Sequence, residues 1–437
     1  MKFVGILGYV VPLVFVGVIV GVVVPIADLT RDPVFAKERI RLNVTEYNSF
    51  DLTLTWSGNS SWYNVSNGIN TYNVTANYYK FTGLQPDTQY QLSVASEDLD
   101  KVYLNQTTRR LKVLFLAGQS NMQGQGDFYN PAIDVSHPKV FQYVIGDQYS
   151  QVRTDRSGQV VLAQEPMDDG GNAGGLVIGN GLAFARRYMQ QYPNETFLIV
   201  NAAVSSSAFS YDPLSWTGNI YTRARAAMLA VSTRYPTSEL IGIGWIQGES
   251  DVNAGATIYR TKLINLFNQF RTLFYLGNAT TPIMVVGMVP EWIGSDVNRL
   301  AINYVHSIVP NLLPFTTYRA GPTNGVSTVN GIHFSASGQR AIANLFWDSF
   351  TKAYNNSKPV PIEVVGTVVS STSMTVTFDG YGTSFRVNYN NLFATTNTKS
   401  ATIAGLTAGA TYVVTVQGNS AYGLSEPSAP INVIMTQ

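Results

Sequence analysis

The stretch FLAGQSNMQGQGD, residues 115–127, ends a run of apolar β-forming residues and then changes to small and polar residues around one serine. Three later runs are also almost continuously apolar, namely TFLIVNAA at 196–203, LIGIGWIQ at 240–247 and PIMVVGMVP at 282–290. Such runs are typical of strands buried on both faces of a parallel sheet. Helical patterns between and after them, at 178–192, 222–235, 257–276 and 335–354, predict a three-layer α/β/α domain.

Sites in such sheets form at the carboxyl ends of strands, and Ser120 directly follows the first apolar run. Small and polar residues also build ordinary turns, so this segment alone leaves open whether Ser120 is a nucleophile or a turn residue. A serine nucleophile needs a base, an orienting acid and an oxyanion site. The rest of the sequence supplies candidates for all three.

On both sides of this domain, apolar and polar residues alternate with the two-residue period of β-strands. Short alternating runs such as FDLTLTW and YQLSVAS, separated by Asn, Gly and Ser, are typical of an antiparallel sandwich. The segment FTGLQPDTQYQLSVAS resembles the E–F corner of a fibronectin type III domain, with Tyr90 as the corner tyrosine. The segment at 401–428 repeats the pattern with Tyr412 in the matching place. We therefore expect a multidomain fold with two all-β, fibronectin type III-like sandwiches at 36–109 and 358–437, and the α/β/α domain at 111–356.

An apolar segment opens the chain, with no charged residue from Phe3 to Ala27. As a helix, about 25 residues would span roughly 37 Å, enough for a hydrocarbon layer of about 30 Å. We therefore expect a membrane-anchoring hydrophobic helix at 1–29, although Pro12 and Pro25 weaken a straight helix. The alternative is a signal segment that is cleaved from a secreted protein.

Two signals disagree about the side of the membrane. Arg31, Lys37, Arg39 and Arg41 follow the apolar segment and only Lys2 precedes it, which places the bulk of the chain inside by the positive-inside rule. N-glycosylation sequons favour an extracellular or luminal body instead, and they occur at Asn43, Asn59, Asn64, Asn73, Asn105, Asn194, Asn278 and Asn355. We expect the extracellular or luminal arrangement, with the membrane and cell-surface or virion-surface assemblies as partners.

Composition excludes several kinds of site. The formal net charge is +1 and no block of Lys or Arg is present, so no nucleic-acid partner is expected. The absence of cysteine excludes disulfides, thiolate metal sites and a cysteine nucleophile. With only three histidines, a histidine-rich metal site is not expected either, and we expect no cofactor.

Two further polar blocks carry candidate partners for Ser120. GWIQGESDVNAG, at 244–255, continues an apolar run, and NGIHFSASGQ, at 330–339, begins just before the last helical pattern. Together with GQSNMQGQGD these blocks resemble those of the SGNH hydrolases, and more narrowly the branch that contains sialate O-acetylesterases and acetylxylan esterases. The resemblance covers most of 111–355 and implies an SGNH-type parallel-sheet domain.

The resemblance implies that Ser120 is the nucleophile and His333 the base that takes its proton. Many SGNH hydrolases have an Asp three residues before this His, but this sequence has Asn330, which cannot stabilise an imidazolium by charge. In the acetylxylan-esterase branch the acid is the Glu of the Gln-Gly-Glu block, which here is Glu249. The alternative is that Glu249 only shapes its loop, and Asp251 is a spare carboxylate beside it.

The oxyanion site is expected to combine the backbone N–H of Ser120, a second N–H from the loop after the second apolar run, and the Gln247 amide. Asn121, next to the nucleophile, belongs to the same set of oxyanion and substrate candidates. The resembling family usually carries Gly-Gly in the second loop, whereas this sequence has Ser205 and Ser206 there. Ser206 completes the expected set.

Other notable residues have less specific contexts. We expect GLVIGNG, at 175–181, to open a helix through close packing, and His137 and His306 to be structural. Tryptophans can form a sugar-stacking platform but more often pack in cores or loops, and the candidates are Trp216, Trp245 and Trp292.

Together with these residues, the resemblance implies a serine esterase that removes O-acetyl groups from carbohydrate, with an acetylated sialic acid or xylan-like glycan as the substrate. The acetyl group would pass through an acyl-enzyme on Ser120 before water releases acetate. The alternative is a non-catalytic surface, adhesion or glycan-binding protein that retains the same α/β domain.

Overall fold

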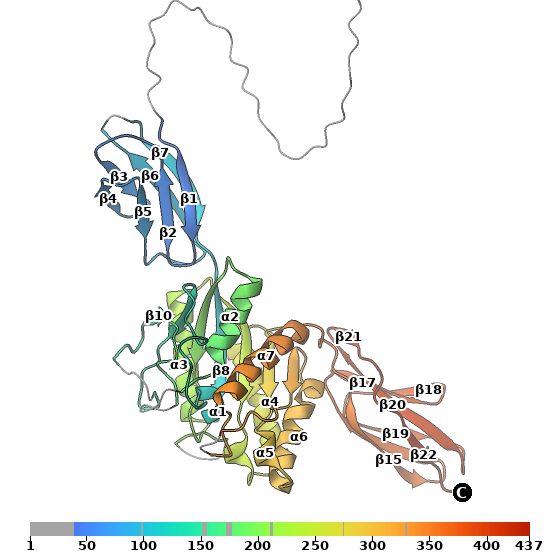
Figure 1. Ribbon diagram of the computed structural model, residues 1–437. Helices are drawn as coiled ribbons and strands as arrows, with labels where there is room; N and C mark the ends of the chain where they lie inside the picture. The colour runs from blue at the N-terminus through green and yellow to red at the C-terminus, as the bar shows by residue number, and fades with distance from the viewer. Residues whose placement is uncertain are drawn as a thin grey trace, which may run out of the picture.

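The computed structural model describes residues 39–97, 99–150, 155–171, 177–209, 213–273, 275–327 and 330–437. In chain order these residues form a β-sandwich, a central α/β domain and a second β-sandwich (Figure 1). The hydrophobic helix expected at 1–29 lies outside the described residues. Within the ranges given above, no helix is both long enough and apolar enough to span a membrane.

A seven-stranded sheet forms the middle layer of the central domain. Its strand order is β10-β9-β11-β8-β12-β13-β14, and all neighbouring pairs are parallel except β10 with β9. The strands are β8 (Leu111–Gly118), β9 (Val140–Tyr143), β10 (Val160–Leu162), β11 (Thr196–Asn201), β12 (Glu239–Ile246), β13 (Ile283–Val286) and β14 (Thr316–Arg319). The four apolar runs are the strands β8, β11, β12 and β13, so this part of the sheet matches the prediction. The strands β9 and β14 and the antiparallel edge strand β10 were not predicted.

Helices cover both faces of this sheet. One apolar core contains side chains of α3, α4 and α6, and the core on the other face contains side chains of α2 and α7. The helical elements are α1 (Ser120–Gln123), α2 (Gly181–Gln191), α3 (Asn219–Arg234), the 3₁₀ helix η1 (Glu249–Asp251), α4 (Ala256–Leu273), α5 (Pro290–Ile293), α6 (Val297–Leu312) and α7 (Ala336–Ala353). The three-layer prediction is confirmed.

Helix α6 was missed in the sequence. Its start has a clear signal, because the Asp296 side chain accepts hydrogen bonds from the backbone N–H groups of Asn298 and Arg299, both at 3.0 Å. Its end carries Pro310, a residue that usually marks a helix break. Since Pro310 lies in the last turn of α6, it disturbs little of the helix that precedes it.

Each sandwich consists of two antiparallel sheets. The first contains β1 (Leu42–Tyr47), β2 (Leu52–Trp56), β3 (Tyr63–Ser66), β4 (Thr71–Val74), β5 (Tyr78–Phe81), β6 (Gln89–Ala95) and β7 (Val102–Thr107). The second contains β15 (Ile362–Ser370), β16 (Ser373–Asp379), β17 (Ser384–Tyr389), β18 (Leu392–Thr396), β19 (Ser400–Ala404), β20 (Thr411–Ser420), β21 (Gly423–Leu424) and β22 (Ile431–Ile434). Apolar side chains from both sheets fill the space between them.

Both corner tyrosines have the geometry that the sequence predicts. The Tyr90 hydroxyl accepts a hydrogen bond from the backbone N–H of Gln85 at 2.8 Å. The Tyr412 hydroxyl accepts one from the backbone N–H of Thr407 at 3.0 Å. A tyrosine that bonds back to the chain a few residues upstream fixes the corner between two strands, so the local prediction is confirmed in both sandwiches.

The sandwiches contact the central domain through different elements. Phe50 packs against Phe141 and Tyr235, with ring centroids 5.0 and 5.4 Å apart. Arg260 of α4 pairs with Glu363 of the second sandwich at 3.0 Å. Phe141 lies in β9 and Tyr235 follows α3, so the first sandwich docks against the amino-terminal edge of the sheet.

The asparagines of all eight sequons are exposed. They are Asn43, Asn59, Asn64, Asn73, Asn105, Asn194, Asn278 and Asn355. Exposure permits glycan attachment, whereas attachment itself and the extracytoplasmic location stay predictions.

Candidate active site

The geometry of the turn after β8 presents Ser120. Gly118 has φ +144°, and a Cβ added there would lie 2.0 Å from the backbone oxygen of Ile246. Only glycine therefore allows the ends of β8 and β12 to approach this closely. Ser120 then begins the short helix α1, and its Oγ lies 2.8 Å from Nε2 of His333. The structure thus brings together two residues separated by most of the central domain.

His333 lies in the loop before α7 and is half-buried. Its backbone is fixed on both sides, because its N–H donates to Oδ1 of Asn330 at 3.1 Å and its carbonyl accepts from the N–H of Ser327 at 2.7 Å. Asn330 therefore orders the backbone of this loop. Burial lowers the pKa of His333 below its usual value, and the nearby charge of Asp127 partly opposes this shift. A lowered pKa keeps the imidazole neutral, as a general base requires.

Asn121 connects the nucleophile turn to the histidine loop. This side chain is fully buried, and its Nδ2 donates to Oε1 of Glu249 at 2.7 Å and to the carbonyl of Ile332 at 3.0 Å. Its Oδ1 accepts from the N–H of Phe334 at 2.9 Å. Both residues that flank the base are therefore bonded to the residue after the nucleophile. Asn121 was expected to contact the oxyanion or substrate, but its side chain is used entirely in these internal contacts.

Glu249 lies in the same network without touching the base. Its Oε1 accepts from Asn121, and its buried Oε2 has no hydrogen-bond partner among the described residues. No hydrogen bond joins any carboxylate to the His333 ring in the described part of the chain, so the expected contact between Glu249 and His333 is not formed. Burial raises the pKa of Glu249 to about 7. A carboxyl that is substantially protonated at neutral pH supplies little of the charge that a triad acid provides.

Gln247 and Asp251 build the loop beneath the site. The Gln247 amide is fully buried and donates to Oδ2 of Asp251 at 2.7 Å and to the carbonyl of Ser207 at 3.2 Å. Asp251 in turn accepts from the N–H of Phe209. These contacts use both donors of the Gln247 amide. The prediction that this amide binds the oxyanion is therefore replaced by a structural role, and Asp251 is also structural.

The other histidines and tryptophans of interest lie elsewhere. His306 is buried 2.8 Å from the Tyr259 hydroxyl, and burial lowers its pKa to about 3, so it is a neutral structural residue as expected. Trp216 and Trp245 are fully buried in the core, which excludes them from a sugar-stacking platform. Trp292 is half-buried, and the guanidinium of Arg299 stacks over its ring, 4.0 Å from the ring centroid.

The loop after β11 approaches α1 through Gln123. Oε1 of Gln123 accepts from the N–H of Ser205 at 2.8 Å, which leaves this N–H unable to bind an oxyanion. Ser206 is exposed and has φ +60°, a conformation that favours glycine. Within the described residues, the backbone N–H groups of Ser120 and Ser206 have no acceptor. Both N–H groups are therefore free to act as oxyanion donors, as is that of Asn121, which also has no acceptor among the described residues.

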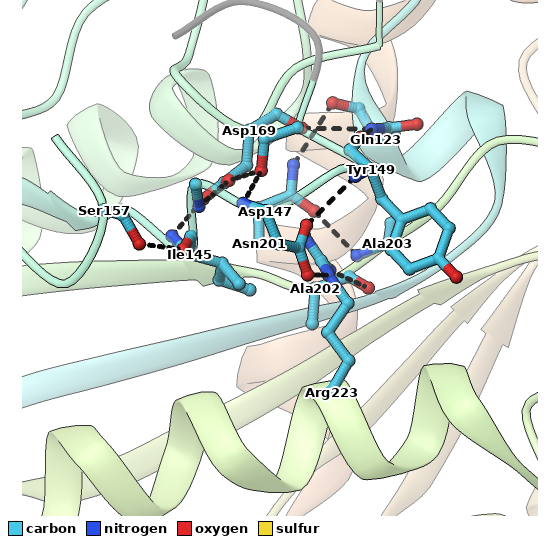
Figure 2. Close-up of polar contacts among 12 residues, drawn as sticks. Gln123, Ile145, Asp147, Tyr149, Ser157, Asp169, Asn201, Ala202, Ala203 and Arg223 are labelled. Carbon is cyan, nitrogen blue, oxygen red and sulfur yellow. Dashed lines mark hydrogen bonds and ion pairs between the residues drawn. The ribbon is translucent and has the colours of Figure 1, made fainter. Parts of the chain in front are cut away.

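Figure 2 shows the polar contacts that fix the neighbouring loop at 145–150. Arg223 donates to Oδ2 of Asp147 at 2.6 Å, and Oδ1 of Asp147 accepts from the N–H of Tyr149 at 3.1 Å. Asp169 accepts from the backbone N–H groups of 145 and 146, at 2.9 and 3.0 Å. Gln123 donates to the carbonyl of Tyr149 at 2.9 Å. This network joins the 145–150 loop, α1 and the Ser205 loop into one wall beside Ser120.

The sequence reasoning missed Asp127 as a functional candidate. Its Oδ1 accepts from the Ser327 hydroxyl at 2.7 Å, and Ser327 is also bonded to the backbone of His333. Asp127 is therefore held close to the base, where its charge raises the pKa of His333. Asp127 ends the glycine-rich stretch after Ser120, but nothing in that stretch indicates its partner.

Two family models match parts of this chain. The family model described as carbohydrate esterase, sialic acid-specific acetylesterase matches residues 110–352, and the fibronectin type III model matches residues 357–434. None of the curated proteins matches this chain.

Solved structures similar to this chain include NanS, with 16% identity and a TM-score of 0.48, covering 56% of this chain and 98% of that one. A carbohydrate acetylesterase from Xanthomonas citri has 15% identity and a TM-score of 0.42, covering 89% of this chain and 96% of that one. The FN5 domain of Drosophila Lar has 20% identity and a TM-score of 0.16, covering 18% of this chain and 98% of that one. The esterase family model matches more than half of the chain, from 110 to 352. The chain therefore belongs to the carbohydrate esterase family of sialic acid-specific acetylesterases.

Proposed function

We propose that this protein is a serine esterase that releases acetate from O-acetylated carbohydrate through an acyl-enzyme intermediate. The observation that carries the proposal is the distance of 2.8 Å between Ser120 Oγ and His333 Nε2, beyond the carboxyl end of β8. A hydroxyl becomes a useful nucleophile when a neutral imidazole can take its proton. His333 can act in this way for two reasons. Its ring is in hydrogen-bond contact with the Ser120 hydroxyl, and burial disfavours the charged form of the imidazole.

The reaction has two halves. Ser120 Oγ attacks the acetyl carbonyl carbon while Nε2 of His333 takes the hydroxyl proton, and the imidazolium then gives that proton to the departing sugar oxygen. The acetyl group remains on Ser120. Water next attacks the acyl-enzyme with His333 as the base, the bond to Ser120 Oγ breaks, and acetate leaves as the serine hydroxyl is restored.

The negative charge that develops on the acetyl oxygen needs nearby donors. The backbone N–H groups of Ser120 and Ser206 fit this role, because neither has an acceptor among the described residues. Donors held in place before the reaction stabilise a tetrahedral intermediate without reorganising during the step. The fixed wall around Gln123 supports this arrangement by holding the Ser205 loop against α1.

Acetate release from a panel of substrates tests the function. The panel pairs an aryl acetate with O-acetylated sialic acid, acetylated xylan and the corresponding deacetylated sugars. We expect hydrolysis of the aryl acetate and faster hydrolysis of at least one acetylated sugar, since a glycan esterase gains binding energy from the sugar. If the protein releases acetate from none of these esters, the non-catalytic glycan-binding function replaces the proposal.

The Asp127 carboxylate is proposed to stabilise the imidazolium of His333. We expect Asp127→Asn to move the acidic limb of the kcat/KM profile to lower pH, because burial then lowers the His333 pKa without opposition. Turnover at pH 8 should fall by up to about tenfold, because the imidazolium that forms during the reaction loses a stabilising charge. The measurement is a pH–rate profile with an aryl acetate.

Asp348→Asn is the matched control, because Asp348 is an exposed carboxylate of α7 with no side-chain hydrogen bond or ion pair among the described residues. It should leave the profile unchanged. An Asp127→Asn enzyme with the parent's acidic limb would remove Asp127 from the mechanism without affecting the roles of Ser120 and His333.

A further inference from the structure

A cavity of about 410 Å³ lies where the first sandwich meets the central domain. We call it the junction cavity. The sandwich contributes Tyr47, Asn48 and Arg109 to its lining, and the central domain contributes Lys139 and Asn194. A volume of several hundred Å³ is in the range of pockets that hold small organic ligands.

The junction cavity is separate from the active site. Lys139 directly precedes β9, and Asn194 lies two residues before β11. These positions are at the amino ends of parallel strands, whereas Ser120 follows the carboxyl end of β8. The junction cavity and the catalytic serine are therefore on opposite edges of the same sheet.

Arg109 brings an uncompensated charge to this cavity. Its guanidinium stacks over the Tyr47 ring, 4.4 Å from the centroid, and its buried Nε has no hydrogen-bond partner in the ranges that the structure describes. Among the described residues, its side chain forms no hydrogen bond or ion pair with a carboxylate. Neighbouring cations differ, since Arg110 pairs with Asp87 at 3.0 Å and Lys80 pairs with Asp51 at 3.4 Å. A planar fork of N–H donors without an acceptor matches a carboxylate.

The rest of the lining suits a sugar ring. Asn194 brings an amide group, and Thr45 and Thr53 bring hydroxyls, and these groups can hydrogen-bond sugar hydroxyls. The Asn48 amide is largely engaged, because its Oδ1 accepts two backbone N–H groups and its Nδ2 donates to Oδ2 of Asp51. Lys139 uses one donor on the carbonyl of Pro193 at 2.9 Å and keeps two others. The carboxylates of Glu46 and of the paired Asp51 can accept further hydroxyl groups. A single inorganic anion would leave most of these groups, and most of the volume, unused.

We propose that the junction cavity binds a sugar that carries a carboxylate, with the carboxylate against Arg109 and the hydroxyls against the amide and threonine side chains. The geometry assigns this site independently of the catalytic proposal, because no residue of the active site lines the cavity. A site of this kind would hold an acidic glycan at a distance from the nucleophile.

Isothermal titration calorimetry of the full chain tests this site. The protein is produced without N-glycans, because Asn194 belongs to a sequon, and the ligands are D-glucuronic acid, its methyl ester, D-glucose and sodium sulfate. We expect only glucuronic acid to bind well. Arg109→Ala should weaken its binding by at least about tenfold, as for the loss of a charge-assisted contact. Arg110→Ala is the matched control and should bind like the parent.

Asn194→Asp provides a second variant that does not touch the stacked pair of Arg109 and Tyr47. Asn194 is exposed, so the change preserves the fold, and the new charge should repel the carboxylate and weaken binding. Unchanged binding in Arg109→Ala, or equal binding of the acid and its methyl ester, would overturn the proposal. Sulfate binding as tight as that of glucuronic acid would reduce the site to a simple anion site. Since binding is measured directly, none of these results depends on esterase activity.

Discussion

Ser120→Ala is expected to abolish acetate release, with kcat falling by up to about 10⁶-fold as in other serine hydrolases that lose their nucleophile. The expected loss is this large because, among the described residues, only the Ser120 hydroxyl is in hydrogen-bond contact with the His333 ring, with 2.8 Å between Ser120 Oγ and His333 Nε2. Active-site titration with a slowly deacylating ester should show no covalent adduct. His333→Ala should lose about as much, because nucleophile and base act as a unit and their losses do not add.

Ser238→Ala is the matched control for this prediction. Ser238 is also a buried serine, but its Oγ has no hydrogen-bond partner in the described part of the chain, and it lies just before β12, at the opposite end of the sheet. The control should keep full activity and form the adduct. If Ser120→Ala still formed an acyl-enzyme, another residue would be the nucleophile and Ser120 would be only a turn residue.

Four strands of the central sheet could be predicted because burial on both faces leaves a signal in the sequence itself. Each of β8, β11, β12 and β13 is a continuous apolar run, and the corner tyrosines Tyr90 and Tyr412 lie in short local patterns. Edge strand β10 has only three residues, and its pairing with β9 depends on the path of the loop between them. Such a path is a tertiary property that no local pattern contains.

The pair of Ser120 and His333 could also be predicted, since both positions follow from short motifs at sheet ends. The roles of the surrounding polar residues could not. Gln247 and Glu249 are in the expected loop, yet the direction of each side chain decides its partner, and here the partners are Asp251 and Asn121. Asp127 approaches His333 only through the fold of the loop that contains Ser327.

These contacts change which residue is expected to hold His333 in position. The sequence predicts that Glu249 contacts the His333 imidazole directly. In that case Glu249→Gln would lower kcat by about 10⁴-fold, as when a triad acid loses its charge. In the structure Glu249 accepts a hydrogen bond from Asn121, and burial raises its pKa to about 7. Glutamine retains an acceptor oxygen for Asn121, so we now expect Glu249→Gln to lose less than about tenfold in kcat.

Asn121→Ala should have the larger effect, with kcat falling by about 10²-fold, because a displacement of about 1 Å at the reacting groups has this cost. The change removes the donor to Glu249 and Ile332 and the acceptor for Phe334, so both neighbours of His333 lose their anchor to the nucleophile turn. Leaving these buried groups unpaired should also lower the free energy of unfolding by about 3 kcal/mol. Because the loss reflects misplacement of the base, kcat should fall more than KM rises.

The measurement is kcat and KM for both variants beside their denaturant unfolding curves. A nearly inactive Glu249→Gln beside a mildly affected Asn121→Ala would contradict this account and would return the role of triad acid to Glu249.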